Sequence, residues 1–292
     1  MSFSSIINAD RVRRVGEALS RIPLDAVHVI ESNDPQYTAV KKIIEKCGPR
    51  GVALVVANAL ISYRLSLPGE NYWLEYANYL STEGCDNDIS IIISRFLAIS
   101  RGNRMLHRQK LSRIQKASRA LQSISVNPLL FRDLRLLVNR IAASLGARPW
   151  EKTIVFAAKM AYYAYRALGI NVKNAEEIPL PIDRRVALLT STSGLIVAEP
   201  EIILQRLRDE AITAWRRVSE ISGMPALHLD AVIWLPAKGI EKYLKMGIEA
   251  AREEYAKRLV DYSQGLIKWD VAKRVATEIL YYDIFSKSKS KK

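Results

Sequence analysis

Lys152 is the first side chain in this sequence whose position suggests chemistry. Gly146 separates two segments of helical periodicity, and Lys152 lies in the first turn of the second segment. A helix start attracts anions and disfavours an ammonium group, so it favours the neutral amine that a nucleophile needs. Gly146 lets the backbone approach an anion such as a DNA phosphate closely.

Phe156 and Lys159 follow Lys152 by four and seven residues, so the three side chains share one helix face. Two lysines on an otherwise apolar helix are costly unless their face lines a site. The alternative is that both lysines extend to solvent at the helix edge, and the pattern alone favours that interpretation.

A carboxylate and two tryptophans complete the candidate chemistry. Asp183 follows a Pro-rich segment and opens a helix, where it serves as a plain N-cap or as a group that stabilises an oxocarbenium and moves protons. Asp230 and Trp234 are four residues apart on one helix, and Trp73 follows a Pro-Gly turn. An aromatic plane with a polar acceptor suits a pocket for an extruded base, whereas a core tryptophan and a surface acid are the alternative.

Helical periodicity over nearly the whole chain predicts an all-α protein that positions these groups. Residues 89–99 are β-branched, but their neighbours favour a helix there too. The other predicted helices span 35–47 (with Asp34 as its N-cap), 52–65, 72–80, 104–121, 129–145, 151–168, 184–195, 202–222 and 229–234, with one or two more in the last fifty residues.

We expect two helical lobes around one cleft. The stiff segment 178–183 holds two prolines and is the expected point at which the chain changes lobe. One lobe then comprises 1–48 with 180–292 and carries Asp183, Asp230 and Trp234. The other comprises 49–179 and carries Lys152.

The charge of the chain points to a polyanionic partner. The 292 residues include 44 Lys and Arg against 30 Asp and Glu, a net charge of +14. Seven cations and no acid lie between Arg101 and Arg119. Such a surface faces phosphates of nucleic acid or an anionic membrane, or it is a solvated helix face that aids solubility. No apolar run approaches the ~18 residues of a membrane span, and no secretory signal is visible, so we expect an intracellular protein.

Cys47 and Cys85 form no C-x-x-C pair, so a four-cysteine zinc or iron–sulfur site is excluded. The three histidines are far apart in sequence, and we expect no metal site. A disulfide between the two cysteines is compatible with the sequence, but reduced thiols are the expectation for an intracellular protein.

Six stretches carry a family resemblance in their order along the chain: DPQYTAV (34–40), NALISYRL (58–65), GENYW (69–73), GARPWEKTIVF (146–156), IPLPIDRRVALLT (178–190) and PALHLDAVIWL (225–235). The sequence resembles the archaeal 8-oxoguanine DNA glycosylases, a branch of the helix-hairpin-helix glycosylases. The hairpin LGARPWEK departs from the L-P-G-V-G of ordinary superfamily members.

This resemblance implies a bifunctional glycosylase and AP lyase in base-excision repair. Lys152 would be the Schiff-base nucleophile and Asp183 the catalytic carboxylate, while Gly146 and Arg148 would contact a DNA phosphate. The residues expected to line the oxidised-base pocket are Gln36, Trp73, Phe156, Lys159, Asp230 and Trp234. The resemblance implies no metal or organic cofactor.

The expected partner is damaged double-stranded DNA, with single-stranded DNA as an alternative and no membrane. We expect a monomer in the cytoplasm, associated with the nucleoid. A glycosylase for another damaged base, a non-catalytic nucleic-acid-binding protein and a membrane-surface protein are the alternatives.

Overall fold

The computed structural model describes residues 6–282, and their contacts divide the chain into two compact helical units. The first unit joins Met1–Asn33 to Pro179–Lys292, and the second is the continuous segment Asp34–Ile178. Residues 6–282 contain no β-strand, only two isolated bridges. The all-α prediction is therefore confirmed.

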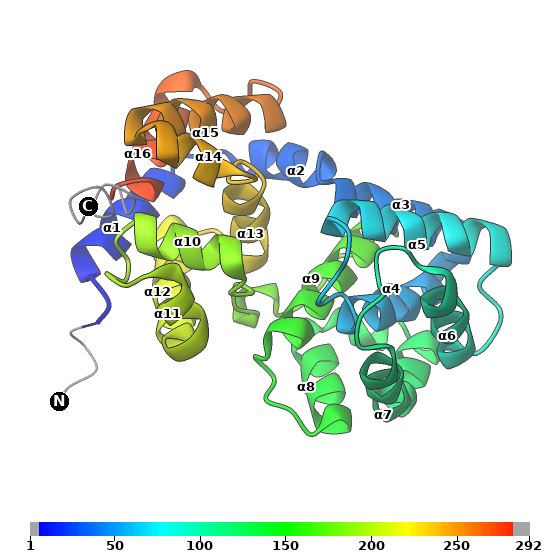
Figure 1. Cartoon of the computed structure of the whole chain (residues 1–292). Coiled ribbons are helices and arrows are strands. Elements are labelled where there is room, and N and C mark those ends of the chain that lie inside the picture. The colour runs from blue at the N-terminus through cyan, green and yellow to red at the C-terminus, as the bar shows by residue number, and fades with distance from the viewer. Residues whose placement is uncertain (1–5, 283–292) are drawn as a thin grey trace. The chain divides into compact units, whose positions relative to one another are not determined.

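The second unit contains seven α-helices: α3 (Pro35–Cys47), α4 (Gly51–Leu60), α5 (Gly69–Glu83), α6 (Ile89–Ile99), α7 (His107–Val126), α8 (Leu134–Leu145) and α9 (Lys152–Ala167). All ten residues of α4 are buried, as its continuous apolar sequence requires. It packs against α9 and α7, while α3 lies along α5 and α9 (Figure 1). These contacts fix the start of α9 against a rigid core.

The first unit contains α1 (Ala9–Leu19), α2 (Leu24–Ser32), α10 (Arg184–Thr192), α11 (Pro200–Arg206), α12 (Arg208–Ser222), α13 (Ala226–Trp234), α14 (Ile240–Met246), α15 (Ile248–Tyr262) and α16 (Trp269–Ile279). Helix α1 packs against α12 and α16, so the beginning and end of the described chain share one core. Trp215 lies inside this core and donates its indole N–H to Thr190 Oγ1 at 2.8 Å.

Several helix boundaries differ from those expected. The predicted helix 202–222 is interrupted at Leu207, where φ is −120°, giving α11 and α12. Between Ile240 and Ile279 the structure has three helices rather than the one or two expected near the chain end, because Gly247 (φ 138°) separates α14 from α15 and Gly265 (φ 80°) follows α15.

The unit boundary in the structure lies at Asn33, so residues 34–48 belong to the second unit and not, as expected, to the first lobe. The reason is packing: α3 contacts α5 and α9 of the second unit. The second boundary, between Ile178 and Pro179, falls in the Pro-rich segment.

The expectation of reduced cysteines is wrong in this structure. Cys47 ends α3, and Cys85 comes just after α5, which packs on α3. Their Cα atoms lie 5.5 Å apart and the side chains form a disulfide, a separation in the usual range for such bonds. The sequence could not show that these two helix ends meet.

No helix within residues 6–282 is long and apolar enough to cross a membrane.

Candidate active site

Lys152 lies at the start of α9, directly after a hairpin. Helix α8 ends at Gly146, whose left-handed conformation (φ 61°, ψ 38°) favours glycine. Glu151 precedes α9 in an extended conformation, and no side chain caps this helix start. Lys152 is exposed there. The structure thus has an uncapped helix N-terminus, suited to an anion, beside an accessible amine.

Helix α7 also contacts the first turn of α9. Arg113 Nη2 donates to Thr153 Oγ1 at 2.6 Å, so the residue after the candidate nucleophile is tied to the basic helix. This bond could not be predicted from the sequence, because Thr153 and Arg113 belong to separate helices. Arg148, the second predicted phosphate contact, is an exposed side chain of the hairpin.

Lys159 does not extend to solvent, contrary to the simpler interpretation of its helix. Its side chain is 2% exposed and its Nζ lies 3.8 Å from Oδ2 of Asp34, which is fully buried. Asp34 also accepts hydrogen bonds from the Tyr163 hydroxyl (2.9 Å) and from the backbone N–H of Gln36 (2.8 Å). The buried Lys159 thus lies beside a carboxylate that is itself held by two hydrogen bonds. A buried charge needs such a counter-ion.

Trp73 of α5 and Phe156 of α9 are in direct contact. Their ring centroids are 6.2 Å apart at an interplanar angle of 70°, an edge-to-face contact. Trp73 is fully buried, yet its indole Nε1 has no hydrogen-bond partner among the described residues. A buried donor without a partner costs free energy, and an acceptor beside the indole would remove that cost.

Gln36 belongs to the same group of contacts. It is buried on α3, and its Nε2 lies 3.3 Å from the point where a Cβ on Gly69 would stand. Gly69 opens α5, the helix that carries Trp73. The contacts thus connect the four pocket residues predicted for this unit through α3, α5 and α9.

In the first unit, Asp183 is both an N-cap and a partner of Trp234. Its Oδ1 accepts the N–H of Val186 at 2.8 Å, and its Oδ2 accepts the indole N–H of Trp234 at 2.9 Å. Asp230 is buried one helical turn before Trp234 on α13. The structure therefore brings Asp183 and Trp234 into direct contact, although 51 positions separate them in sequence.

Two residues, one in each unit, have contacts that the sequence did not predict. Asp34 was predicted only as a helix cap, but it is also the counter-ion of Lys159. The signal for this pair is that a buried lysine needs a carboxylate nearby. Arg185 was not identified at all; its guanidinium carbon lies 3.7 Å from the centroid of the Trp234 ring. No sequence signal marks that contact.

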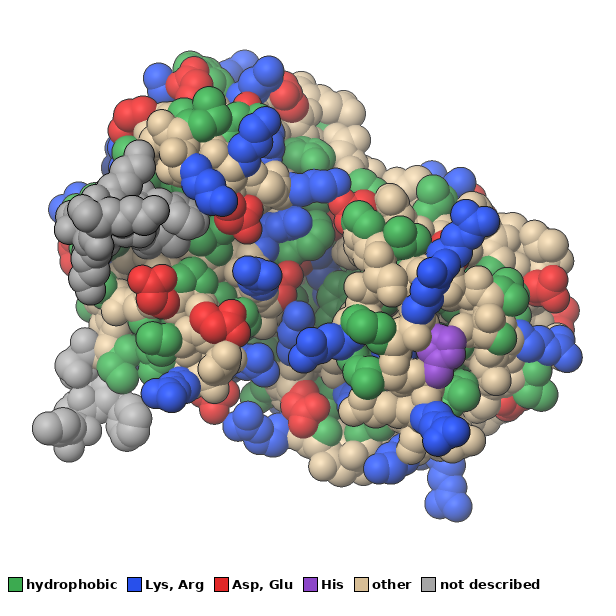
Figure 2. Space-filling model, in the orientation of Figure 1, with side chains coloured by type: hydrophobic (Ala, Val, Ile, Leu, Met, Phe, Trp, Pro, Cys, Tyr) green, Lys and Arg blue, Asp and Glu red, His purple; other side chains and the backbone are tan. Residues whose placement is uncertain are grey.

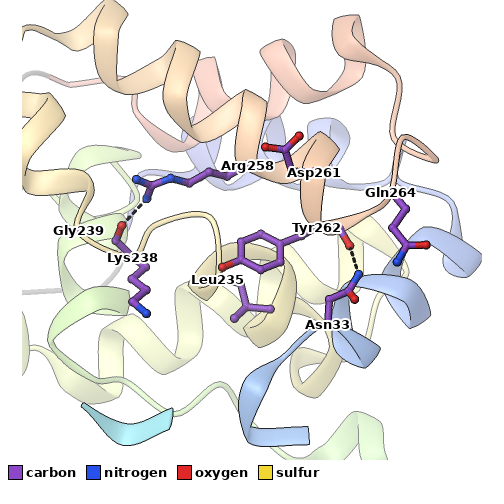
Figure 3. A pocket seen from close by; sticks show the side chains of 8 residues that line it. All are labelled: Asn33, Leu235, Lys238, Gly239, Arg258, Asp261, Tyr262 and Gln264. Atoms are coloured by element: carbon purple, nitrogen blue, oxygen red, sulfur yellow. Dashed lines mark hydrogen bonds between the residues drawn. The ribbon is translucent and has the colours of Figure 1, made fainter. Parts of the chain in front are cut away.

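A cavity of about 750 Å³ in the first unit contains none of the predicted site residues (Figure 3). Arg258 reaches the backbone carbonyl of Lys238 on one side of it, and Asn33 Nδ2 donates to the Tyr262 carbonyl at 2.8 Å. Its lining residues are Asn33, Leu235, Lys238, Gly239, Arg258, Asp261, Tyr262 and Gln264. Within residues 6–282, no group of three or more His, Cys, Asp or Glu side chains is placed to hold a metal ion.

The structure is similar to the crystal structure of an 8-oxoguanine DNA glycosylase from Pyrobaculum aerophilum complexed with 8-oxoguanosine, with a TM-score of 0.71 and 29% sequence identity. The match covers 88% of this chain and 97% of that one. The fold is therefore that of a helix-hairpin-helix DNA glycosylase.

Residues 16–274 match the N-glycosylase/DNA lyase family AGOG, and the chain belongs to this family. It is 35% identical to an N-glycosylase/DNA lyase of Pyrobaculum aerophilum over 79% of this chain and 87% of that protein. It is 36% identical to that of Methanopyrus kandleri over 74% and 86%, respectively. The chain is therefore a DNA N-glycosylase with lyase activity, an enzyme of base-excision repair whose substrate is DNA.

Proposed function

We propose that this enzyme removes 8-oxoguanine from double-stranded DNA and then nicks the strand, with Lys152 as nucleophile and Asp183 as catalytic carboxylate. Relatives named N-glycosylase/DNA lyase and a similar solved 8-oxoguanine DNA glycosylase support the choice of reaction and base.

One observation carries the assignment of the base pocket. Phe156 lies one turn after Lys152 on α9 and contacts Trp73, whose buried indole N–H has no partner within residues 6–282. A purine in contact with Phe156 offers an aromatic plane for stacking, and an oxidised purine adds polar atoms along its edge. Its oxygen or nitrogen acceptors would satisfy the Trp73 donor.

The first step is displacement of the base. The base leaves the duplex stack at a cost of a few kcal/mol. The lone pair of the Lys152 amine forms a bond to C1′ of the sugar, and the bond from C1′ to the base breaks. The base departs with that electron pair and takes up a proton, while the carboxylate of Asp183 stabilises positive charge that develops on the sugar.

The second step breaks the strand. The attached amine loses a proton, and its lone pair forms a double bond to C1′ as the bond from C1′ to the ring oxygen breaks. The ring oxygen takes up a proton, so that Lys152 and C1′ are joined as a protonated imine. Removal of a proton from C2′ then expels the 3′ phosphate by β-elimination. Hydrolysis of the imine releases the enzyme, so every step uses side chains of this chain and water.

DNA is held through phosphates at two neighbouring features. Gly146, Arg148 and the uncapped start of α9 bind one phosphate at the hairpin. Helix α7 adds an outer row of exposed cations, Arg108, Lys116 and Arg119, within a stretch from Ile89 to Arg132 that contains no acid. In Figure 2, blue side chains occupy the lower part of the second unit, where α7 lies in Figure 1.

As part of this proposal, the enzyme acts as a monomer at the nucleoid, and single-stranded DNA is an alternative substrate. In the second unit, Gln36, Trp73, Phe156 and Lys159 are the residues that we propose to contact the base. In the first unit, Asp230 and Trp234 have this proposed role.

The test is excision and nicking of a panel of duplexes with one 8-oxoguanine, one other damaged base or no lesion. We expect cleavage of the 8-oxoguanine duplex, loss of both activities in Lys152→Gln, and wild-type activity in Lys173→Gln, an exposed lysine of the same unit. Equal cleavage of another lesion would show that the pocket assignment is wrong. An active Lys152→Gln protein would refute the nucleophile.

A further inference from the structure

Arg185 occupies an unusual position for a cation. It is the second residue of α10, in the first turn, where the helix field disfavours positive charge. Its neighbour Arg184 is exposed, but Arg185 is half-buried and folds onto Trp234. The contact with Trp234 thus offsets the unfavourable interaction between the Arg185 charge and the start of α10.

That contact holds Trp234 at two points. The guanidinium carbon lies over the indole, 3.7 Å from the ring centroid, and Nη1 donates to the Trp234 carbonyl at 2.9 Å. Trp234 ends α13, where backbone carbonyls lack intrahelical donors and attract cations. One arginine therefore fixes both the backbone and the ring of this residue.

Trp234 in turn fixes the carboxylate. Its indole N–H donates to Asp183 Oδ2 at 2.9 Å, while Asp183 Oδ1 is held by the N–H of Val186. The three side chains are linked within the first unit, because Arg185 contacts the Trp234 ring and Trp234 donates to Asp183. Arg185 lies over one face of the indole.

We propose that Arg185 is a positioning residue for base excision: it holds the Trp234 ring at the angle at which the opposite indole face stacks on the extruded base. This rests on the proposed function. The guanidinium also draws charge from the indole ring, which strengthens stacking on an electron-rich oxidised purine. Lysine cannot replace it fully, because an ammonium has neither the planar face nor the fork of donors.

The experiment compares two substrates in single turnover. An 8-oxoguanine duplex needs the stacking contact, whereas an abasic-site duplex has no base to stack and needs only imine formation and β-elimination. We expect Arg185→Gln to slow 8-oxoguanine excision about tenfold and to change abasic-site cleavage less than threefold. Arg185→Lys should recover part of the loss, and the exposed neighbour variant Arg184→Gln should match wild type.

A double variant separates positioning from fold stability. In a Trp234→Ala background, Arg185→Gln should have no further effect on excision, because its target is gone. Equal losses on both substrates, undiminished excision in Arg185→Gln, or the same tenfold loss in the Trp234→Ala background would each overturn the inference. A wild-type protein that cleaves abasic sites but leaves 8-oxoguanine in place would instead refute the proposed base, and this inference with it.

Discussion

The buried pair of Lys159 and Asp34 shows how a single residue position is decided by a partner that the local sequence does not reveal. The helix pattern of α9 alone allowed an ammonium that reaches solvent. The structure buries it 3.8 Å from Asp34, at the start of a different helix. Local signals did predict Asp34 as the cap of α3 and Gly146 as the break after α8, because caps and left-handed turns depend on neighbouring residues.

Trp73 gives a prediction at the same scale. Trp73→Phe removes an indole N–H that has no partner within the described chain. The loss of this donor should therefore not lower the free energy of unfolding, and only the smaller ring's weaker packing should do so. We expect affinity for an 8-oxoguanine duplex to fall about tenfold, the value of one hydrogen bond of ~1.4 kcal/mol. Fluorescence anisotropy with lesion and undamaged duplexes measures the change.

Trp215 is the matched control for Trp73. It is equally buried, but its indole N–H already donates to Thr190 in the first unit. Trp215→Phe should lower the free energy of unfolding and keep lesion preference. If Trp73→Phe bound lesion and undamaged duplex with the wild-type ratio, the indole would have no part in recognition.

At the scale of elements, α7 separates two kinds of cation. Arg108, Lys116 and Arg119 are exposed, whereas Lys110 is fully buried, donates to Asn103 Oδ1 and lies 4.9 Å from the Tyr63 ring centroid. Burial lowers the pKa of Lys110 from 10.5 to about 8. The sequence showed the basic run but not which of its members faces the core.

This buried lysine gives α7 a pH signature. Between pH 8 and 10.5 the unfolded chain binds a proton that folded Lys110 has released, so the free energy of unfolding rises with pH over that window. In Lys110→Met this contribution should vanish, while exposed Lys116→Met should retain it. Denaturant unfolding at several pH values measures it, and parallel curves for wild type and Lys110→Met would contradict a lowered pKa.

The disulfide joins α3 to the segment after α5 and closes a loop with a sequence separation of 38. Chain-entropy arguments give such a loop roughly 4 kcal/mol of stabilisation. We expect reduction to lower the free energy of unfolding of the protein by about 2–4 kcal/mol. Denaturant unfolding with and without reductant measures this, and the double variant Cys47→Ser, Cys85→Ser should be insensitive to reductant. Identical midpoints for oxidised and reduced wild type would contradict the bond.

Most of the helices could be predicted because apolar periodicity and capping residues are local. Helix α6 spans Ile89–Ile99 as expected, despite its β-branched residues. The break at Leu207 could not be predicted, since no Gly or Pro marks it and Leu207 instead packs against the core. The unit boundary at Asn33 could not be predicted from the sequence either, because it depends on which helices α3 contacts.

For the whole molecule, the net charge of +14 predicts binding that depends strongly on salt. Each phosphate contact contributes about 0.9 to the slope of log K against log salt. Lys116→Gln and Arg119→Gln should each reduce the slope by about 1 and weaken lesion and undamaged duplex alike. Lys41→Gln is the control, since Lys41 is exposed on α3 and lies 3.9 Å from Glu45. An unchanged slope in the α7 variants would show that this helix does not face DNA.

The most direct test of the central claim is covalent trapping. Borohydride reduction during turnover on an 8-oxoguanine duplex should fix the imine as a stable protein–DNA adduct, and mass spectrometry of the digested adduct should place the sugar on Lys152. Lys152→Gln should yield no adduct, while Lys173→Gln should yield as much as wild type. An adduct on another lysine, or a trapped Lys152→Gln protein, would contradict the account.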